Sequence, residues 1–204
     1  MALSAAEIER GVKHLRRADP VLRTVIRRAG PFTLKLKQDR FQALVFSIVS
    51  QQISGKAALA IRKRLLDRVG PDGLTPENIA VLPLEELRAV GLSKQKASYI
   101  QDLAGRVHQG ELPLRRLARL SDDDVIEALI QVRGIGVWTA HMFLIFSLGR
   151  LDVMPHGDYG VRSAIQRLYD LPNLPDRATC QRIAEPWRPY ASIAAWYCWR
   201  SLEF

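Results

Sequence analysis

Apolar residues recur at helical rather than alternating spacing along nearly all of the chain, and proline and glycine separate the periodic segments. The segment RFQALVFSIVSQQ (40–52) is typical of a buried helix, and SGKAALAIRKRLLDRVG (54–70) of an amphipathic one. Further helices are predicted at roughly 158–169, 176–184 and 189–202, the last of them rich in aromatic residues. Only PFTLKLK (31–37) alternates, which indicates a short extended segment. The predicted fold class is therefore all-α.

Several of the predicted helix ends carry capping residues. Ser4 with Glu7, and Ser121 with Asp124, have the spacing of a capping box, in which the hydroxyl accepts a free main-chain N–H. Ser93 is an expected N-cap, and Pro20 can occupy the first turn of a helix. Gly30 and Gly70 are expected to end their helices. These signals predict short, well-delimited helices.

Composition limits the class of protein. The chain has 204 residues, 48% of them hydrophobic and 25% charged, which is enough for a buried core in one domain or in two small lobes. Cys180 and Cys198 are too few for a disulfide framework or for the four thiolates of an iron–sulfur cluster. The longest apolar runs are far shorter than a membrane span, and the first residues do not resemble a secretion signal. We expect a soluble protein that is not secreted and has no membrane partner.

The net charge of the chain indicates a possible class of partner. Lysine and arginine number 30 against 21 aspartates and glutamates, for a formal charge of +9. Basic side chains that neutralise phosphates release condensed counterions, so a nucleic acid is a suitable partner. The alternative is that the basic surface only keeps the protein soluble.

The segment 122–146 is predicted to form a helix, a glycine turn and a second helix. Gly134 permits backbone conformations closed to other residues, and Gly136 stands where the second helix begins. The free amides there form an anion site, to which Thr139 in the first turn can add a hydroxyl or an amide. The alternative is a corner between helices that needs glycine only for steric clearance.

The sequence VRGIGVWTAHMF resembles the helix–hairpin–helix motif of the DNA glycosylase superfamily of that name, with Arg133 where many members have proline. LDVMPHGDYGVRSA is similar to the loop that follows in this superfamily and ends in an essential aspartate. The resemblance is greatest to the 3-methyladenine DNA glycosylase II branch, without that branch's N-terminal β-rich lobe. It rests on these two motifs together with SIVSQQISGKAA, VGLSKQKASYIQDLA and PWRPYASIAAWYCW, which follow one another in family order.

The resemblance implies that Asp158 is catalytic, because a carboxylate beside C1′ stabilises the positive charge that develops on the deoxyribose. Without the motif, an N-cap would be the better interpretation of this aspartate. Asp152 corresponds to an acidic position that organises the loop. Where some relatives have a second acid directly before the catalytic one, this chain has Gly157. His156 is expected to serve the structure of the loop.

Trp138 stands where strand-cutting members of the superfamily place the lysine that forms a Schiff base, so base removal without lyase activity is expected. The resemblance also places Trp138, Trp196 and Met142 in the pocket for the flipped base, with core packing as the alternative. Aromatic rings suit alkylated purines because these carry positive charge. Trp187 and Trp199 are expected to lie in the core.

The wedge that fills the gap in the duplex maps to Gln52, with Gln51 beside it as a substrate-binding residue. A polar cap at a helix junction is the alternative interpretation. By the same resemblance, main-chain carbonyls of Ile130, Val132 and Ile135 correspond to ligands of a structural sodium or potassium ion. No cofactor is expected to be required, and no iron–sulfur cluster is expected.

The resemblance implies one catalytic unit, 1–204, with two helical lobes and the DNA cleft between them. The expected lobes are about 35–112, carrying the wedge, and about 1–34 plus 113–204, carrying both the hairpin and Asp158. The implied function is hydrolysis of alkylated purines such as 3-methyladenine and 7-methylguanine from damaged double-stranded DNA, by a monomer in the bacterial cytoplasm or the eukaryotic nucleus. A non-catalytic DNA-binding module and a glycosylase for hypoxanthine or uracil are the alternatives.

Overall fold

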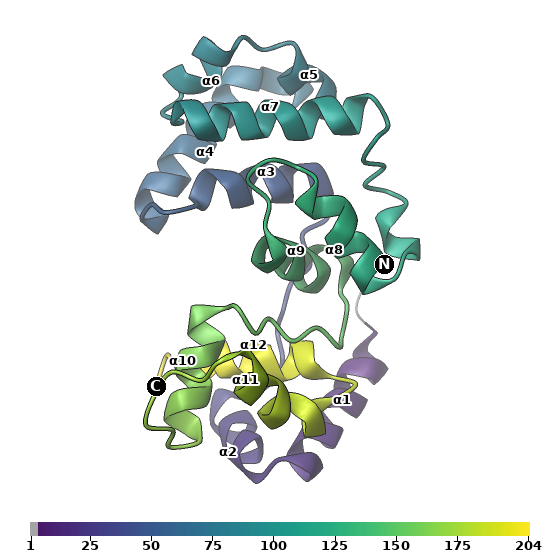
Figure 1. Ribbon diagram of the computed structural model, residues 1–204, viewed down its shortest axis with the longest axis vertical. Helices are drawn as coiled ribbons and strands as arrows, with labels where there is room; N and C mark the ends of the chain where they lie inside the picture. The colour runs from purple at the N-terminus through teal and green to yellow at the C-terminus, as the bar shows by residue number, and fades with distance from the viewer. Residues whose placement is uncertain (1–3) are drawn as a thin grey trace. The chain divides into compact units, whose positions relative to one another are not determined.

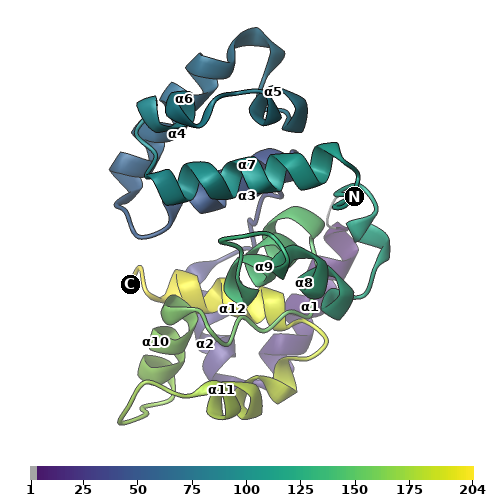
Figure 2. The same cartoon turned by 45° about the horizontal axis from the view of Figure 1, so that its top comes forward.

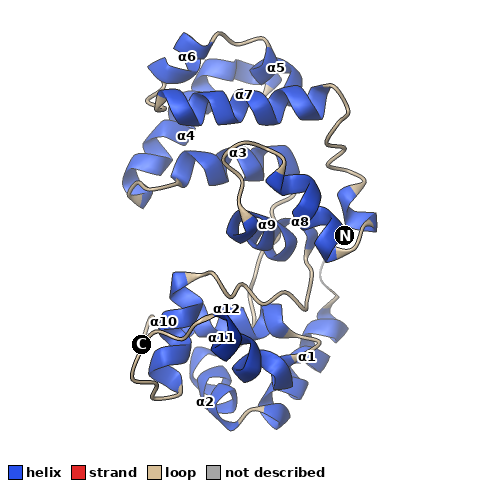
Figure 3. Cartoon of the chain, viewed as in Figure 1, coloured by secondary structure: helices blue, strands red, loops and turns tan. Residues whose placement is uncertain are grey.

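The computed structural model describes residues 4–204, and every regular element within that range is a helix (Figure 3). The prediction of an all-α protein is therefore confirmed. The alternating PFTLKLK segment joins two helices without forming a strand. Among the described residues, no helix has both the length and the apolar character needed to cross a bilayer.

The chain forms two compact units, each with its own helices. Unit 1 contains the described part of Met1–Leu36 together with Leu144–Phe204, and unit 2 is the continuous stretch Lys37–Phe143. The chain thus leaves unit 1 after the second helix and returns to it at Leu144.

Unit 2 is built around a long central helix. Figure 1 shows α7 running beside α5 and α6. In chain order, the elements are α3 (Arg40–Ser50), α4 (Gly55–Val69), η1 (Gly70–Asp72), α5 (Pro76–Ala80), α6 (Leu84–Ala89), α7 (Lys94–His108), η2 (Leu117–Arg119), α8 (Asp122–Ile130) and α9 (Val137–Phe143). Helix α3 also packs against α4, α7 and α9, so it connects the hairpin to the rest of the unit.

Capping side chains begin several helices of unit 2. Ser93 Oγ accepts the Lys96 N–H at 3.2 Å, and Ser121 Oγ accepts the Asp124 N–H at 3.1 Å, as the sequence predicted. Ser54 caps α4 in the same way, through the Ala57 N–H at 3.3 Å. Ser4 precedes α1, but its side chain makes no capping hydrogen bond, so that part of the prediction is wrong.

Unit 1 combines the two ends of the chain. Its elements are α1 (Ala5–Ala18), α2 (Pro20–Ala29), the π-helical turn η3 (Leu144–Leu148), α10 (Tyr159–Leu168), α11 (Arg177–Ala184), η4 (Glu185–Trp187) and α12 (Ala191–Ser201). Figure 2 shows α12 beside α2 and α10, and these helices contact one another through their buried faces. The shared core includes Leu22, Ile165, Trp187 and Tyr197. A fully buried side chain of this size contributes about 1.5–3 kcal/mol.

A buried aspartate joins the N-terminal helices to the C-terminal part of unit 1. Asp19 is the N-cap of α2 and accepts the N–H groups of Val21 and Leu22 at 2.8 and 3.1 Å. Its second oxygen accepts the Trp187 indole N–H at 2.8 Å and the Tyr169 hydroxyl. Because the four donors come from three different segments, this carboxylate organises the junction while remaining hydrogen-bonded.

Two boundaries separate the units, and only one of them lies near its predicted position. The first boundary lies at residues 36 and 37, close to the predicted position, but the second lies at residues 143 and 144 rather than near 112. The hairpin therefore belongs to unit 2, whereas Asp158 belongs to unit 1. The reason is that side chains of α3 and α7 contact the hairpin turn directly, and the sequence pattern gave no indication of these contacts.

Candidate functional site

The hairpin between α8 and α9 contains a four-residue turn. The Val132 carbonyl accepts the Ile135 N–H at 3.1 Å, and Gly134 has a φ of +82°. A closed turn with positive φ at its third residue is a type II turn, which places Arg133 second. Helix α9 then begins after Gly136, whose carbonyl accepts the Ala140 N–H at 3.0 Å.

Gly134 is needed for steric as well as conformational reasons. A Cβ atom at this position would lie 2.0 Å from Cδ2 of Tyr99 on α7. The turn therefore lies directly against the tyrosine ring. Gly136 is different, because a Cβ atom there would meet nothing within 4 Å. The alternative that the glycines serve only steric clearance fits Gly134 better than Gly136.

Gln51 and Lys96 fix the turn to α3. The Gln51 side-chain amide donates to the Gly134 carbonyl at 2.8 Å. Lys96 Nζ in turn donates to the carbonyls of Val49 and Gln51, at 2.9 and 2.5 Å. We predicted a substrate contact for Gln51, but the structure engages its side chain with the hairpin.

Gln52 has an unusual backbone conformation. It is exposed, and its φ of +54° lies in the left-handed region, which residues other than glycine seldom adopt. Such a conformation costs about 1–3 kcal/mol and tends to occur at functional sites. The observation agrees with the predicted wedge, whose contact with DNA stays a prediction.

The predicted ion ligands are main-chain groups of the same hairpin. Ile130 ends α8, and the side chains of Val132 and Ile135 are buried. The Val132 carbonyl accepts the Ile135 N–H, but a carbonyl oxygen has a second lone pair. Hard cations take main-chain oxygens as ligands, so the donor type fits sodium or potassium. Binding of either ion stays a prediction.

Thr139 faces the interior. Only 4% of its surface is exposed, and it lies on the same buried face as Ala140 and Phe143. A side-chain contact between Thr139 and a phosphate is therefore not supported, which leaves only its main-chain amide for the predicted role. Helical periodicity turns Thr139 inward while Trp138, one position earlier, faces outward.

Asp158 lies at the N-terminus of α10 in unit 1. Its Oδ1 accepts the Val161 N–H at 2.8 Å, so it is an N-cap, and only 8% of its surface is exposed. The same oxygen also accepts the indole N–H of Trp199 at 2.8 Å, across 41 residues of sequence. Asp158 thus carries the capping role that we weighed as an alternative, together with a long-range contact that fixes its orientation.

Trp199, which is expected in the core, packs against the core of unit 1 but also makes a polar contact. Trp199 is half-buried, donates to Asp158, and stacks on Phe146 with ring centroids 5.5 Å apart. Trp187, in contrast, is 0% exposed and belongs to the core, as predicted.

The predicted pocket residues differ in burial. Trp138 is 44% exposed in the first turn of α9, so the alternative of core packing does not apply to it. Met142, one turn later, is half-buried. Trp196 of unit 1 packs edge-on against Phe32 at 4.9 Å, and the Arg200 guanidinium lies 5.8 Å from its ring. The shared pocket of Trp138 and Trp196 stays a prediction.

The loop before Asp158 is attached to the start of α12. Asp152 accepts the Arg188 Nε–H at 3.0 Å and the Ala191 N–H at 3.3 Å. The Val153 N–H donates to Ser192 Oγ at 2.9 Å. These contacts agree with the expected organising role of Asp152. Burial, followed by the charge of Arg177, lowers the pKa of His156 in the same loop.

Comparisons with known proteins agree with this geometry. Residues 45–189 match the family described as HhH-GPD superfamily base excision DNA repair protein. A relative from Schizosaccharomyces pombe, DNA-3-methyladenine glycosylase 1, is 37% identical over 168 residues, which cover 81% of this chain and 73% of the relative.

Two solved structures have a similar fold. One is the Schizosaccharomyces pombe 3-methyladenine DNA glycosylase in complex with abasic DNA, with a TM-score of 0.86, 32% identity and coverage of 96% of this chain and 97% of the other. The second is a DNA-3-methyladenine glycosidase from Bacillus halodurans, with a TM-score of 0.85, 38% identity and coverage of 94% and 88%.

Proposed function

Because this chain belongs to the HhH-GPD superfamily of base excision DNA repair proteins, we propose that it hydrolyses the N-glycosidic bond of alkylated purines in double-stranded DNA. Its substrates are bases such as 3-methyladenine and 7-methylguanine, flipped out of the duplex. The observation that carries the proposal is the buried Asp158 carboxylate, held by N–H groups of Val161 and Trp199. Names of relatives such as the 37% identical yeast protein support the choice of substrate.

The reaction follows from the chemistry of a cationic leaving group. When the bond from C1′ to the base nitrogen breaks, its electron pair neutralises the positive charge of the alkylated purine. The positive charge then develops on the sugar, where the Asp158 carboxylate stabilises it. A water oxygen bonds to C1′, and Asp158 orients this water and accepts its proton.

Binding of the damaged base uses aromatic side chains. The exposed Trp138 stacks on the flipped base, and Trp196 and Met142 contribute further walls of the pocket. Gln52 occupies the gap that the flipped base leaves in the duplex. The hairpin amides at Gly134, Gly136 and Thr139 bind a backbone phosphate. The main-chain carbonyls of Ile130, Val132 and Ile135 would hold a sodium or potassium ion, which would add positive charge for the DNA backbone.

The proposal includes the remaining properties of the enzyme. It acts as a monomer, requires no organic cofactor or iron–sulfur cluster, and works where the genome lies, in the cytoplasm of a bacterium or the nucleus of a eukaryote. The excess of basic residues supports a DNA partner, because the formal charge is +9.

Substitution of the catalytic carboxylate tests the proposal. Incubated with methylated duplex DNA, the wild type should release 3-methyladenine or 7-methylguanine, and Asp158→Asn should release them about 10²–10³-fold more slowly while still binding DNA. Asp176→Asn is the matched control, because Asp176 caps α11 through the Thr179 N–H at 2.8 Å just as Asp158 caps α10. The control should keep wild-type activity.

Three outcomes would contradict the proposal. If the wild type frees no modified base, the protein is a binding module. If it frees hypoxanthine or uracil from matched duplexes but no alkylpurine, the substrate class is wrong. If Asp158→Asn works as well as the wild type, the catalytic assignment is wrong.

A second experiment tests the absence of lyase activity. Trp138 has no amine with which to form a Schiff base at the position where a lysine would act. Borohydride added during turnover should therefore trap no covalent adduct between protein and DNA, and the abasic strand should remain intact. A trapped adduct would indicate that another amine of the chain is the nucleophile.

A further inference from the structure

We propose that Asp102 of α7 is a positioning residue of the hairpin, which holds the turn through the Arg133 main-chain N–H so that the neighbouring amides are ready to bind DNA. The inference rests on the proposed function for its consequence, but its geometric part does not depend on that function. Asp102 lies within VGLSKQKASYIQDLA, one of the segments on which the family resemblance rests, but no function was assigned to it from the sequence.

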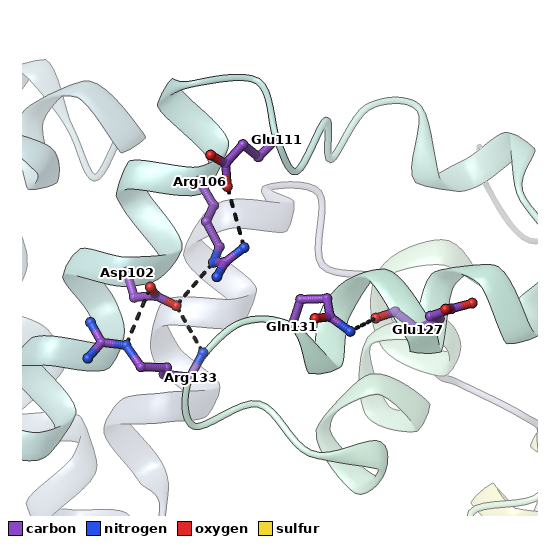
Figure 4. A network of polar contacts seen from close by, with 6 residues as sticks. All are labelled: Asp102, Arg106, Glu111, Glu127, Gln131 and Arg133. Atoms are coloured by element: carbon purple, nitrogen blue, oxygen red, sulfur yellow. Dashed lines mark hydrogen bonds and ion pairs between the residues drawn. The ribbon is translucent and has the colours of Figure 1, made fainter.

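The turn leaves the N–H of its second residue without an internal partner. In a type II turn, the first carbonyl bonds to the fourth N–H, here Val132 to Ile135 at 3.1 Å. The N–H of the second residue, Arg133, points out of the turn and needs another acceptor. Asp102 Oδ2 accepts it at 2.9 Å (Figure 4). A main-chain group of the turn is therefore bonded to a charged side chain of α7.

The same carboxylate also contacts the Arg133 side chain. Asp102 Oδ1 lies 3.4 Å from Arg133 Nε, so the two oxygens contact the main chain and the side chain of one residue. Arg106, one turn further along α7, approaches Oδ2 at 3.3 Å and continues the network to Glu111 at 3.4 Å (Figure 4).

Among these contacts, the hydrogen bond from the Arg133 N–H contributes most to holding the turn. The Arg133 and Arg106 side chains are 60% and 34% exposed, so solvent screens their ion pairs. The Asp102 side chain is only 16% exposed, and a hydrogen bond from a main-chain N–H to a charged acceptor is among the stronger ones.

Three residues on one face of α7 serve the same region. Lys96, Tyr99 and Asp102 follow one another at intervals of three residues, a spacing that brings side chains to one side of a helix. Lys96 holds the end of α3, the Tyr99 ring packs on Gly134, and Asp102 holds Arg133. This face of α7 thus holds the hairpin turn and the end of α3 in place.

Turn chemistry provides a specific test. Proline is favoured at the second position of a type II turn, because its fixed φ suits the turn and it has no N–H to satisfy. The substitution Arg133→Pro should therefore remove the need for Asp102. Arg133→Ala removes the guanidinium but keeps the N–H, so it separates the two contacts of the carboxylate.

The experiment measures D102A in three backgrounds: wild type, R133P and R133A. The readouts are amide hydrogen exchange at Gly134 and Ile135 in the free protein, the Kd for a short duplex with an abasic-site analogue, and the rate of base release at saturating DNA. In the wild-type and R133A backgrounds, D102A should speed exchange and raise Kd about tenfold. In the R133P background, it should change neither by more than about twofold.

Conservative and control variants distinguish positioning from general loss of structure. D102N keeps an acceptor oxygen and should retain most of the affinity that D102A loses. E111Q weakens only the outer contact between Arg106 and Glu111, and should leave exchange and Kd unchanged. The loss in D102A should fall on Kd more than on the rate of base release at saturating DNA. Melting temperatures identify any variant that fails to fold.

The proposal is overturned if D102A is equally harmful in the R133P background, or if D102N behaves like D102A. It is also overturned if D102A leaves amide exchange in the turn unchanged. Hydrogen exchange is measured without DNA. If the wild type releases no modified base, the proposed function is contradicted, but the exchange data still test whether Asp102 holds the turn.

Discussion

The two units contain different kinds of candidate functional group. In unit 1, the functional group is a side chain, the carboxylate of Asp158, and it is held by a main-chain N–H of α10 and the indole of Trp199. In unit 2, the functional groups are main-chain amides and carbonyls of the hairpin turn, and they are held by side chains of Gln51, Tyr99 and Asp102.

This difference follows from what each group must do. A carboxylate that stabilises charge on a sugar must have a fixed position, so one helix terminus and one long-range donor are sufficient. A phosphate contact needs several N–H groups at once, and their directions depend on every backbone dihedral of the turn. The hairpin is therefore more sensitive to its neighbours than Asp158 is.

The largest expected effect on DNA binding comes from Gly134. Gly134→Ala places a methyl group 2.0 Å from a Tyr99 ring atom and requires a left-handed φ, which itself costs about 1–2 kcal/mol. We expect the Kd for duplex DNA to rise at least about tenfold. Binding titrations measure it, with melting temperature recorded in parallel.

Gly136→Ala is the matched control, because its new Cβ meets nothing within 4 Å. Tyr99→Ala combined with Gly134→Ala should recover part of the affinity by removing the overlap. If Gly134→Ala binds as tightly as the wild type, the close contact with α7 does not determine the function of the hairpin.

In unit 1, Trp199→Phe is expected to affect the rate of base release and to have a smaller effect on DNA binding. The phenyl ring can still stack on Phe146, but the hydrogen bond to Asp158 is lost. A hydrogen bond to a charged group contributes about 1.5–3 kcal/mol, so base release should slow about tenfold or more while DNA binding changes little. Single-turnover assays at saturating DNA measure the rate.

Trp187→Phe provides the comparison within the same unit, since Trp187 donates in the same way to the buried Asp19. That variant should lower the melting temperature without slowing base release. If Trp199→Phe slows base release no more than Trp187→Phe does, the indole contact to Asp158 serves stability alone.

The smallest expected effect concerns pH and the loop before Asp158. Burial and the charge of Arg177 lower the pKa of His156 from 6.5, although the main-chain contact at Met154 opposes the shift. The folded state therefore binds the proton less readily than the unfolded state, and the contribution of neutral His156 to stability is lost as pH falls below about 6.5. His156→Asn should flatten the pH dependence of the melting temperature between about pH 5 and 7.

Wild type and His156→Asn should converge in their pH response above pH 7.5, where the histidine is neutral in both folded and unfolded states. An identical slope for the two proteins below pH 6.5 would mean that another group dominates the acid response.

Local features of the structure could be predicted from the sequence with good accuracy. The predicted helices at 158–169, 176–184 and 189–202 correspond to Tyr159–Leu168, Arg177–Ala184 and Ala191–Ser201. Ser93 and Ser121 cap their helices as their spacing indicates, because a capping bond joins residues only three positions apart. The family was identified in the same way, from short motifs whose spacing is local.

Contacts between distant segments could not be predicted. Asp102 and Arg133 are 31 residues apart, Trp199 and Asp158 are 41 apart, and Gln51 and Gly134 are 83 apart. Each contact joins a side chain to a partner in another element, and no periodicity connects such positions. The assignment of the hairpin to the wrong lobe has the same cause.

The sequence alone therefore determined the helical class, the family, and the aspartate and tryptophan that the proposed reaction uses, because these depend on local spacing and on residue type. Tertiary structure decided what holds them in place. It brought the indole of Trp199 to Asp158 and the carboxylate of Asp102 to the Arg133 N–H. Packing within each unit determines these contacts, since the fold of unit 2 brings α7 to the hairpin and the fold of unit 1 brings α12 to the start of α10.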